Sequence, residues 1–288
     1  MSEEFRAQAL ELYGAVWPHV PTGIQQARTW GSDWFEVSTP FTAEEDGRLV
    51  AHAGVIRCQL SFGGEARQVA AVHGVCVHPD YRSRGLARKV LEEALDHVDR
   101  IGLRTTILWS EKVDLYRRFD FEAVPEKVFR APAPRGRRIH ASRLNLSQRS
   151  DRERLRSVLE RRRPVSGVAA AADPGWHFLI DLALWTEARD FLIHLPEHEA
   201  IVVAEKEGSR LHLYDVLAEE VPPAADLVGA AQTVLGGPIE EMDVYFTPDR
   251  LDLETEAAEH PIEDLFMVRG ESLIDRSVGF ALSPFTRT

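Results

Sequence analysis

One continuous stretch, residues 72–98, constrains the fold of this chain more than any other. It opens with a strand-like run of six residues that is apolar except for His73, and from residue 86 onward apolar side chains recur at the spacing of an amphipathic helix. A short loop with two arginines and one glycine joins the two parts: Arg82, Arg84 and Gly85. The loop thus lies on a helix N-terminus, where unpaired backbone N–H groups and the positive end of the helix dipole attract anions. The pattern predicts a strand–loop–helix unit that binds phosphate.

The residue types in this loop suit a bulky phosphate ligand. Gly85 has no Cβ, so its backbone can approach a ligand closely, and the two arginines offer charge-assisted donors to phosphate oxygens. Neither the Walker pattern nor the dinucleotide fingerprint occurs in the chain. The loop reads Arg82-x-x-Gly85-x-Ala87, which resembles the [Q/R]-x-x-G-x-[G/A] acyl-CoA pyrophosphate loop of GNAT-superfamily N-acetyltransferases.

A second resemblance follows the helix. Residues 105–110 are β-branched and apolar and predict a strand, and residues 113–122 resemble the family's LYxxxGF segment. Asp120 stands where that segment usually has glycine, and Asp tolerates the left-handed backbone angles that a helix end requires. Residues 108–119 resemble the Eis-type branch, whose members acetylate amines on aminoglycosides. The resemblance covers residues 35–130 well and the remainder poorly.

The resemblance implies an α/β (α+β) fold: a mixed central sheet with helices on both faces, as in GNAT proteins. Turn signals at Asp46-Gly47 and Gly63-Gly64 predict hairpins, and residues 127–130 are expected to be the last strand of this sheet. The chain of 288 residues is long for one domain. We expect a catalytic acyl-CoA-binding domain, a linker and a second, degenerate GNAT-like domain without a cofactor loop, over residues 1–133, 134–147 and 148–288.

Composition excludes several classes of protein. A net charge of −12 argues against a general nucleic-acid binder, and no apolar run approaches the ~18 residues of a membrane span. The first residues lack the features of a signal peptide, so we expect a cytoplasmic protein without a membrane partner. Cys58 and Cys76 lie in apolar runs and are expected to be buried thiols, and no metal-site spacing is present. The sequence leaves open whether the protein forms a homo-oligomer.

The resemblance also implies how acetyl-CoA, the expected co-substrate, would be held. Its pantetheine arm would lie along Val75, Cys76 and Val77 and pair with their backbone, and a main-chain N–H there would polarise the thioester carbonyl. Its pyrophosphate would bind at the loop and the first turn of the helix, at Arg82, Ser83, Arg84, Gly85, Leu86 and Ala87.

For catalysis, Tyr116 is the expected general acid, because a phenol stays protonated at neutral pH and can donate to a thiolate. Family members often carry a Glu near the position of Ala71, and this chain lacks that Glu. His73 would share a strand face with Ala71 and Val75 and is one candidate base. The carboxylate of the C-terminal residue Thr288 and water are the others. The acceptor pocket is expected at Trp34, Phe35, Trp109 and Ser110.

These features predict an N-acetyltransferase that moves an acetyl group from acetyl-CoA to a primary amine of a small, cationic acceptor. The alternatives are transfer of a longer acyl chain and a module that senses acetyl-CoA without turnover. Acidic residues of the second half would either attract a cationic acceptor or form a solubilising surface: Glu240, Glu241, Asp243, Asp249, Asp252, Glu254, Glu256 and Glu259.

Overall fold

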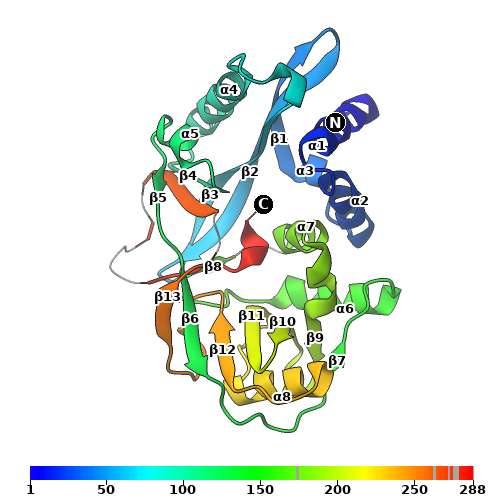
Figure 1. Ribbon diagram of the computed structural model, residues 1–288, viewed down its shortest axis with the longest axis vertical. Coiled ribbons are helices and arrows are strands. Elements are labelled where there is room, and N and C mark those ends of the chain that lie inside the picture. Colours follow the sequence, from blue (N-terminus) through cyan, green and yellow to red (C-terminus); the bar gives the residue numbers. More distant parts are fainter. Residues whose placement is uncertain (173–174, 262–263, 272, 275–278, 288) are drawn as a thin grey trace.

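The computed structural model describes residues 1–172, 175–261, 264–271, 273–274 and 279–287. Within these residues the strands form two seven-stranded mixed sheets, one above the other in Figure 1. The first sheet has the order β1-β2-β3-β4-β14-β5, with β8 paired to β2. Its strands are β1 (Ser38–Glu45), β2 (Arg48–Phe62), β3 (Glu65–Val77), β4 (Thr105–Ser110), β5 (Glu122–Ala123), β8 (Ala169–Ala171) and β14 (Leu265–Gly270).

The second sheet has the order β13-β6-β12-β11-β10-β9-β7. Its strands are β6 (Lys127–Pro132), β7 (Ser142–Arg143), β9 (Leu192–Leu195), β10 (Ala200–Glu207), β11 (Arg210–Leu217), β12 (Glu241–Val244) and β13 (Glu256–Glu259). The helices are α1 (Glu3–Val16), α2 (Val20–Trp30), α3 (Trp34–Val37), α4 (Leu86–Arg100), α5 (Val113–Arg117), α6 (Arg149–Arg161), α7 (Trp176–Leu184) and α8 (Ala224–Leu235). Short 3₁₀ turns cover Pro79–Tyr81, Thr186–Phe191, Pro196–His198 and Pro284–Thr286.

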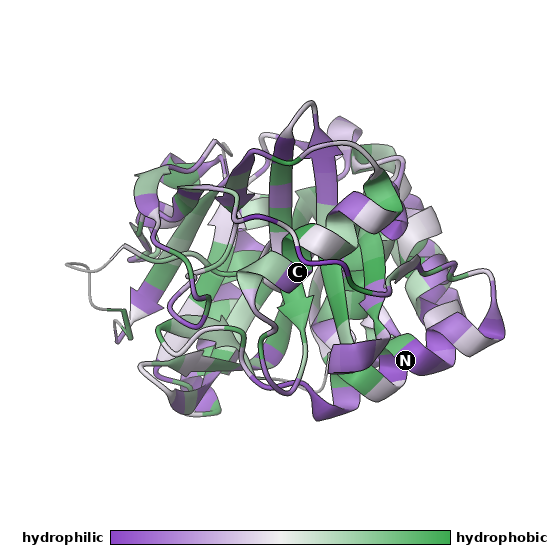
Figure 2. Ribbon diagram, turned by 90° about the horizontal axis from the view of Figure 1, so that it is seen from below, coloured by the Kyte–Doolittle hydropathy of each residue, from purple (hydrophilic) through white to green (hydrophobic). Residues whose placement is uncertain are grey.

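Helices cover both faces of the first sheet, as the sequence predicts. The apolar face of α4 packs Val90, Leu91 and Ala94 against strand residues that include Val55 and Val72. The other face carries α1 and α2, whose apolar side chains share a core with α7 from the second half. Apolar residues accordingly concentrate along the strands, while polar residues colour the outer faces of the helices (Figure 2). The α/β fold class is thus confirmed.

Several local predictions are also confirmed. Asp46 and Gly47 form the turn between β1 and β2, and residues 63–64 form the turn before β3. Asp120 has φ = 64°, which is the left-handed conformation expected where the family usually has glycine. No helix in the described part of the chain combines the length and the apolar character needed to cross a membrane.

One strand assignment was wrong. Residues 127–130 lie in β6, which pairs with β12 and β13 of the second sheet and not with the first sheet. The place beside β4 is filled by β14, which pairs antiparallel with it from Leu265↔Ser110 to Gly270↔Thr105. The expected linker likewise contains an edge strand, β7. A local pattern identifies a strand but not its partner, and the partner here lies more than 100 residues away.

Candidate active site

The candidate site is a cavity of about 1000 Å³ at the point where two parallel strands separate. β3 and β4 are paired at Ala70↔Thr106 and Ala71↔Ile107, and no further pair follows in the ladder. Beyond this point, main-chain and side-chain atoms of residues 72–77 form one wall, and residues 108–112 form another. The expected pantetheine-binding residues, Val75, Cys76 and Val77, therefore line an open space beside a strand with an unused edge.

A β-bulge interrupts β3 inside this wall. His52 is opposite Cys76 and Gly54 is opposite His73, so the single residue Ala53 faces two residues of β3. Gly74, the first of those two, has φ = 57°. The extra residue reverses the alternation of side chains, so His73 lies on the face of Cys76 and not on that of Val75. The sequence-based placement of His73 beside Val75 was wrong for this reason.

The loop before α4 has the geometry of an anion site. Gly85 is the N-cap of α4, has φ = 77° and offers no side chain to the first N–H groups of the helix. A Cβ on Gly85 would meet no atom within 4 Å, so the requirement for glycine comes from the backbone angle. Ser83 also has a positive φ of 64°. The unpaired N–H groups at this helix end face solvent and are available to an anion.

The two arginines of the loop lie differently. Arg82 lines the cavity, and its Nε lies 3.4 Å from the carbonyl oxygen of Val77, at the end of β3. Arg84 forms an ion pair of 2.9 Å with Glu45 and covers the ring of Tyr81 at 4.8 Å. Arg82 is therefore the arginine that faces the space where the two strands separate.

Tyr116 lies on α5 and lines the cavity from the side opposite β3. Its ring packs edge-on against Phe121 at 5.9 Å, and only 7% of the residue is exposed. Burial raises the pKa of the Tyr116 phenol to about 12, although a hydrogen bond with the Ser110 side chain opposes the change. The phenol is thus protonated at neutral pH, as a proton donor must be.

His73 also lines the cavity, at the base of the bulge. Its Nε2 lies 2.7 Å from Ser38 Oγ, and its buried Nδ1 has no hydrogen-bond partner within the described residues. Burial, together with the neighbouring His52 and His177, lowers the pKa of His73 well below its usual value. His73 is therefore neutral at pH 7, with one ring nitrogen uncommitted.

The four expected acceptor-pocket residues divide into two pairs. Trp109 and Ser110 line the cavity at the end of β4. Trp34 lies behind His73, with their ring centroids 4.6 Å apart, and Phe35 packs against Phe5 at 6.4 Å. Both of these rings are buried in the core that α1 and α2 cover, and neither lines the cavity.

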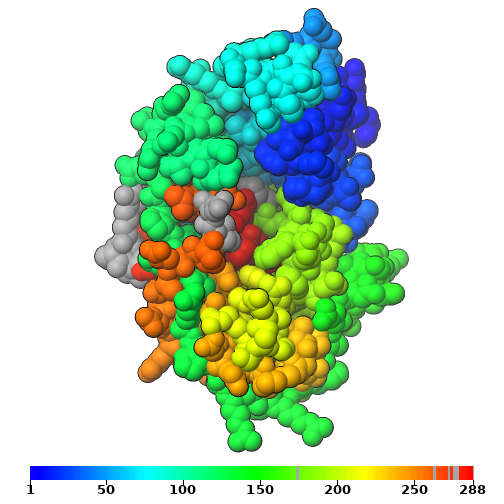
Figure 3. Space-filling view, in the orientation of Figure 1, coloured from blue at the N-terminus to red at the C-terminus, as the bar shows by residue number. Residues whose placement is uncertain are grey.

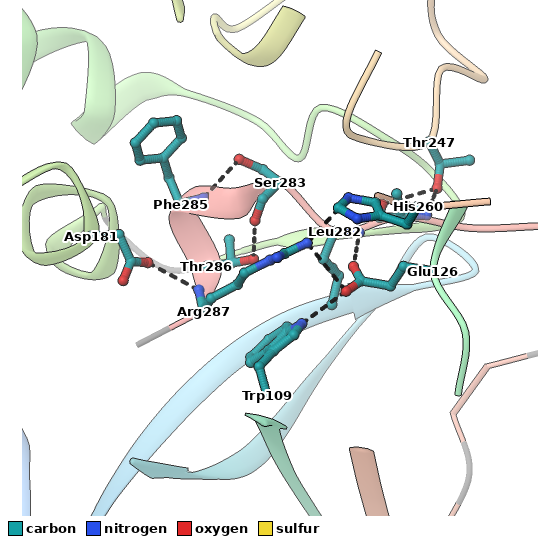
Figure 4. Close-up of polar contacts among 11 residues, drawn as sticks. Trp109, Glu126, Asp181, Thr247, His260, Leu282, Ser283, Phe285, Thr286 and Arg287 are labelled. Carbon is teal, nitrogen blue, oxygen red and sulfur yellow. Dashed lines mark hydrogen bonds and ion pairs between the residues drawn. The ribbon is translucent and has the colours of Figure 1, made fainter. Parts of the chain in front are cut away.

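The C-terminal segment lies next to the site and is connected to it through Glu126 (Figure 4). Buried Glu126 accepts hydrogen bonds from the Trp109 indole and from the backbone N–H of Leu282, both at 2.9 Å, and forms an ion pair of 3.4 Å with Arg287. Figure 3 shows the last residues, in red, in a hollow between α1, α5 and α7. Thr288, whose carboxylate is one candidate base, lies outside the described residues.

A second, smaller cavity of about 300 Å³ adjoins the first, because Asp264 lines both. Glu126, Glu259 and His260 line it as well. Of the eight acidic residues singled out in the sequence, Glu259 is the one in its wall. Others have structural partners: Glu241 and Asp243 pair with Arg210, and Asp252 accepts a hydrogen bond from the first residue of α8.

The sequence analysis missed two residues beneath the bulge. His52 of β2 lies 2.9 Å from the carbonyl oxygen of Gly74 through Nδ1, and Tyr13 of α1 lies 3.0 Å from His52 Nε2. Both side chains are buried. A histidine in a long apolar strand is the signal in the sequence, but the contact depends on a bulge and a helix that local patterns do not place.

Known proteins are similar to this chain in sequence and in fold. The family model for the acetyltransferase (GNAT) domain matches residues 1–124. An uncharacterized N-acetyltransferase of Methanocaldococcus jannaschii is 26% identical over 125 residues, which are 39% of this chain and 54% of that protein. Mycothiol acetyltransferase of Cellulomonas flavigena is 30% identical over 122 residues, which are 38% of this chain and 34% of that protein.

Among solved structures, Eis1 from Mycobacterium abscessus superposes with a TM-score of 0.60 at 19% identity, and the likeness covers 94% of this chain and 72% of that one. A likeness of this extent includes both sheets, in agreement with a second GNAT-like half. The two curated relatives, by contrast, match over 54% and 34% of their own lengths. Residues 1–124 of this chain thus match the family model of the acetyltransferase (GNAT) domain.

Proposed function

We propose that this protein is an acetyl-CoA-dependent N-acetyltransferase that acetylates a primary amine of a small, cationic acceptor. The observation that carries the proposal is the cavity between β3 and β4, which has an anion-ready loop at one end and Tyr116 in its wall. A GNAT domain over residues 1–124 supports the same reaction class. We also propose the chemical class of the acceptor and the roles of individual residues, as follows.

The residues present fit acetyl-CoA. The free N–H groups from Gly85 onward and the guanidinium of Arg82 would hold the pyrophosphate. The backbone of residues 75–77 would pair with the pantetheine arm along the open edge of β3, as in strand addition. When bound, the thioester would supply an activated acetyl group in the cavity.

Transfer requires that one C–N bond forms and one C–S bond breaks. A main-chain N–H at the bulge of β3 would stabilise the oxyanion that develops on the carbonyl. Tyr116 would donate its proton to the departing thiolate, and solvent would then return a proton to the phenolate. Because its pKa is raised, the Tyr116 phenol is protonated at neutral pH and can offer its O–H to the departing sulfur.

The amine must lose a proton before or during attack. We assign this task to His73, because this residue lines the cavity, is neutral at pH 7 and has a buried Nδ1 without a hydrogen-bond partner among the described residues. Its lowered pKa would make it pass the proton on to solvent rather than store it. If the His73→Gln variant has an unchanged pH profile of kcat/KM, His73 is not the base, and water or the C-terminal carboxylate takes the proton.

The cationic nature of the acceptor is inferred from the smaller cavity. Glu126, Glu259 and Asp264 line the smaller cavity together with Lys127, and Asp264 also lines the larger one. Glu126 is already paired with Arg287, so Glu259 and Asp264 are the carboxylates that would attract a cation. Negative groups in a concave site attract cations, and salt weakens that attraction over a Debye length of about 8–10 Å near physiological ionic strength. An amine that carries further positive charges would therefore reach the site more readily than a neutral one.

A screen for thiol release tests the function. Acetyl-CoA is mixed with polyamines, aminoglycosides, amino acids and peptides, and the acetylated product is identified by mass spectrometry. We expect turnover with at least one polycationic amine and a kcat/KM that falls as salt rises. Binding of acetyl-CoA without transfer to any amine would contradict the proposal in favour of a sensor. Faster turnover with a longer acyl-CoA would show that the protein transfers a longer acyl group in preference to acetyl.

Matched variants test the acidic cavity. Glu259→Gln removes one carboxylate from its wall, and Glu240→Gln removes the same charge from an exposed position in the second half. We expect the first change to raise the KM for the amine and to reduce the salt dependence, while the second leaves both unchanged. Equal behaviour of the two variants would show that the acidic half is only a solubilising surface.

A further inference from the structure

The bulge in β3 is held by a side chain from the neighbouring strand. A carbonyl oxygen can only accept a hydrogen bond, so at 2.9 Å the Nδ1–H of His52 donates to the carbonyl of Gly74. The ring also lies close to the Cα of Gly74, because a Cβ there would approach Nδ1 to 3.4 Å. The contact thus fixes the one peptide group that departs from the regular ladder.

Tyr13 selects the form of His52 that can make this contact. The Tyr13 hydroxyl lies 3.0 Å from Nε2 and 3.3 Å from Nδ1 of His52. With Nδ1 donating to the carbonyl of Gly74, Nε2 of the neutral ring is the nitrogen that can accept from this hydroxyl. The pKa of His52 is lowered to about 4 by burial, so the ring is neutral at pH 7. Both ring nitrogens are therefore satisfied, and a chain of two hydrogen bonds joins α1 to the bulge.

The orientation of this carbonyl determines that of the next N–H. The peptide between Gly74 and Val75 is trans, because the described chain contains no cis bond, so its C=O and N–H point in opposite directions. His52 holds the carbonyl on its own side of the peptide and does not line the cavity, whereas Val75 does. The N–H of Val75 is thereby turned away from His52.

We propose that His52, oriented by Tyr13, is a positioning residue that aims the Val75 N–H at the thioester carbonyl. The inference rests on the proposed function, because it assigns the oxyanion donor to one peptide and explains what holds that peptide. His52 touches neither the cavity nor a reacting atom, so it acts through the backbone. A preorganised donor needs such support, because a misdirected N–H does not stabilise the developing charge.

The test uses two ligands that differ only at the reactive end: CoA, which ends in a thiol, and an unreactive acetyl-CoA analogue in which CH₂ replaces the thioester sulfur. The N–H of Val75 can donate a hydrogen bond to the carbonyl of the analogue. CoA has no carbonyl at this position, so it cannot accept this hydrogen bond. Calorimetry then gives a preference ratio that does not depend on turnover. We expect the wild-type protein to prefer the analogue about 5- to 10-fold, as one hydrogen bond of ~1 kcal/mol allows.

Three variants distinguish positioning from packing. His52→Leu removes the donor and should bring the preference ratio close to one while the affinity for CoA stays the same. His52→Asn places an amide N–H near the position of Nδ1 and should retain most of the ratio. Val55→Ala, in the same strand, removes buried carbon away from the bulge and should leave the ratio unchanged. A folded His52→Leu protein with the wild-type ratio would overturn the proposal, as would a wild-type ratio of one.

Kinetics gives a second readout. With a competent amine, His52→Leu should lower kcat about 10- to 100-fold with little change in the KM for acetyl-CoA, somewhat less than the ~100- to 1000-fold loss of a whole oxyanion donor. A rise in KM equal to the fall in kcat would indicate general damage and would contradict positioning. Failure to find any amine would refute the proposed function, while the binding ratio would still decide the role of His52.

Discussion

Two side chains at the site, Tyr116 and His73, combine burial with a polar atom that can give or take a proton. Burial raises the pKa of Tyr116 to about 12 and lowers that of His73. Each group is therefore neutral over a wide range around pH 7. Because the phenol pKa is higher in the folded state, the associated stability is present below pH 10 and is lost as the pH rises toward 12.

The first prediction concerns Tyr116→Phe, which keeps the buried ring and removes the hydroxyl proton. We expect kcat to fall on the order of 100-fold with little change in the KM for acetyl-CoA, the scale for losing a general acid. In the wild-type protein, kcat should show no alkaline loss with a midpoint near 10, since the phenol ionises near pH 12. Steady-state rates from pH 6 to 10.5 check both statements. A variant with nearly native kcat would make Tyr116 a packing residue.

At the scale of elements, the unit formed by β3, its loop and α4 is the part that local sequence signals describe best. The helix, the loop glycine and the strand β4 follow from periodicity and residue type, and Asp120 from the family pattern. The bulge at Gly74 and the contacts of His52 could not be predicted in this way. They depend on the register between two strands and on a helix that is distant in sequence.

The second prediction separates backbone strain from charge at the start of α4. Gly85 has φ = 77°, and a Cβ there would meet open space. Gly85→Asn tolerates this angle, Gly85→Ala strains it by about 1 kcal/mol, and Gly85→Glu adds a negative charge where the pyrophosphate would bind. We expect calorimetric CoA affinity to fall little for Asn and about 100-fold or more for Glu. If the Gly85→Ala and Gly85→Glu variants bind CoA with equal affinity, the pyrophosphate does not bind at this loop.

The third prediction concerns the attachment of the C-terminal segment. Glu126 is 7% exposed and is paired with Arg287, which approaches from the far end of the chain. Arg287→Met leaves a buried carboxylate without its cation and should lower the free energy of unfolding by about 3 kcal/mol. Adding Glu126→Gln to that variant should restore part of the loss, because the charge is then absent. Urea unfolding of the single and double variants measures the coupling, and additive losses would contradict a direct pairing.

For the whole molecule, the two sheets are not successive along the chain. The strands β8 and β14, from the second half, complete the first sheet, and β6, from the first half, lies inside the second sheet between β12 and β13. The sequence predicts both sheets and their helices, but strand exchange arises from pairings that only the folded chain defines. A boundary near residue 133 therefore divides the sequence patterns, but it does not divide the two sheets, because strands from each side of it lie in the other sheet.

The fourth prediction follows from this exchange. A protease site inserted between residues 134 and 135, in the connection after β6, should be cut without separating the two fragments. Each fragment supplies strands to the other's sheet, so the pieces should elute together under native conditions and separate in denaturant. Size-exclusion chromatography before and after cleavage checks this result. Fragments that separate readily in native buffer would show that the exchanged strands contribute little.

The position of β14 also governs the order in which a growing chain can become compact. The free edge of β4 can be covered only after residues Leu265–Gly270 leave the ribosome, although β4 itself ends at Ser110. At roughly 5–20 residues per second, the delay is on the order of ten seconds. During that time the nascent chain presents an unpaired strand edge, the feature through which proteins aggregate. The first sheet therefore stays incomplete until nearly the whole chain has been synthesised.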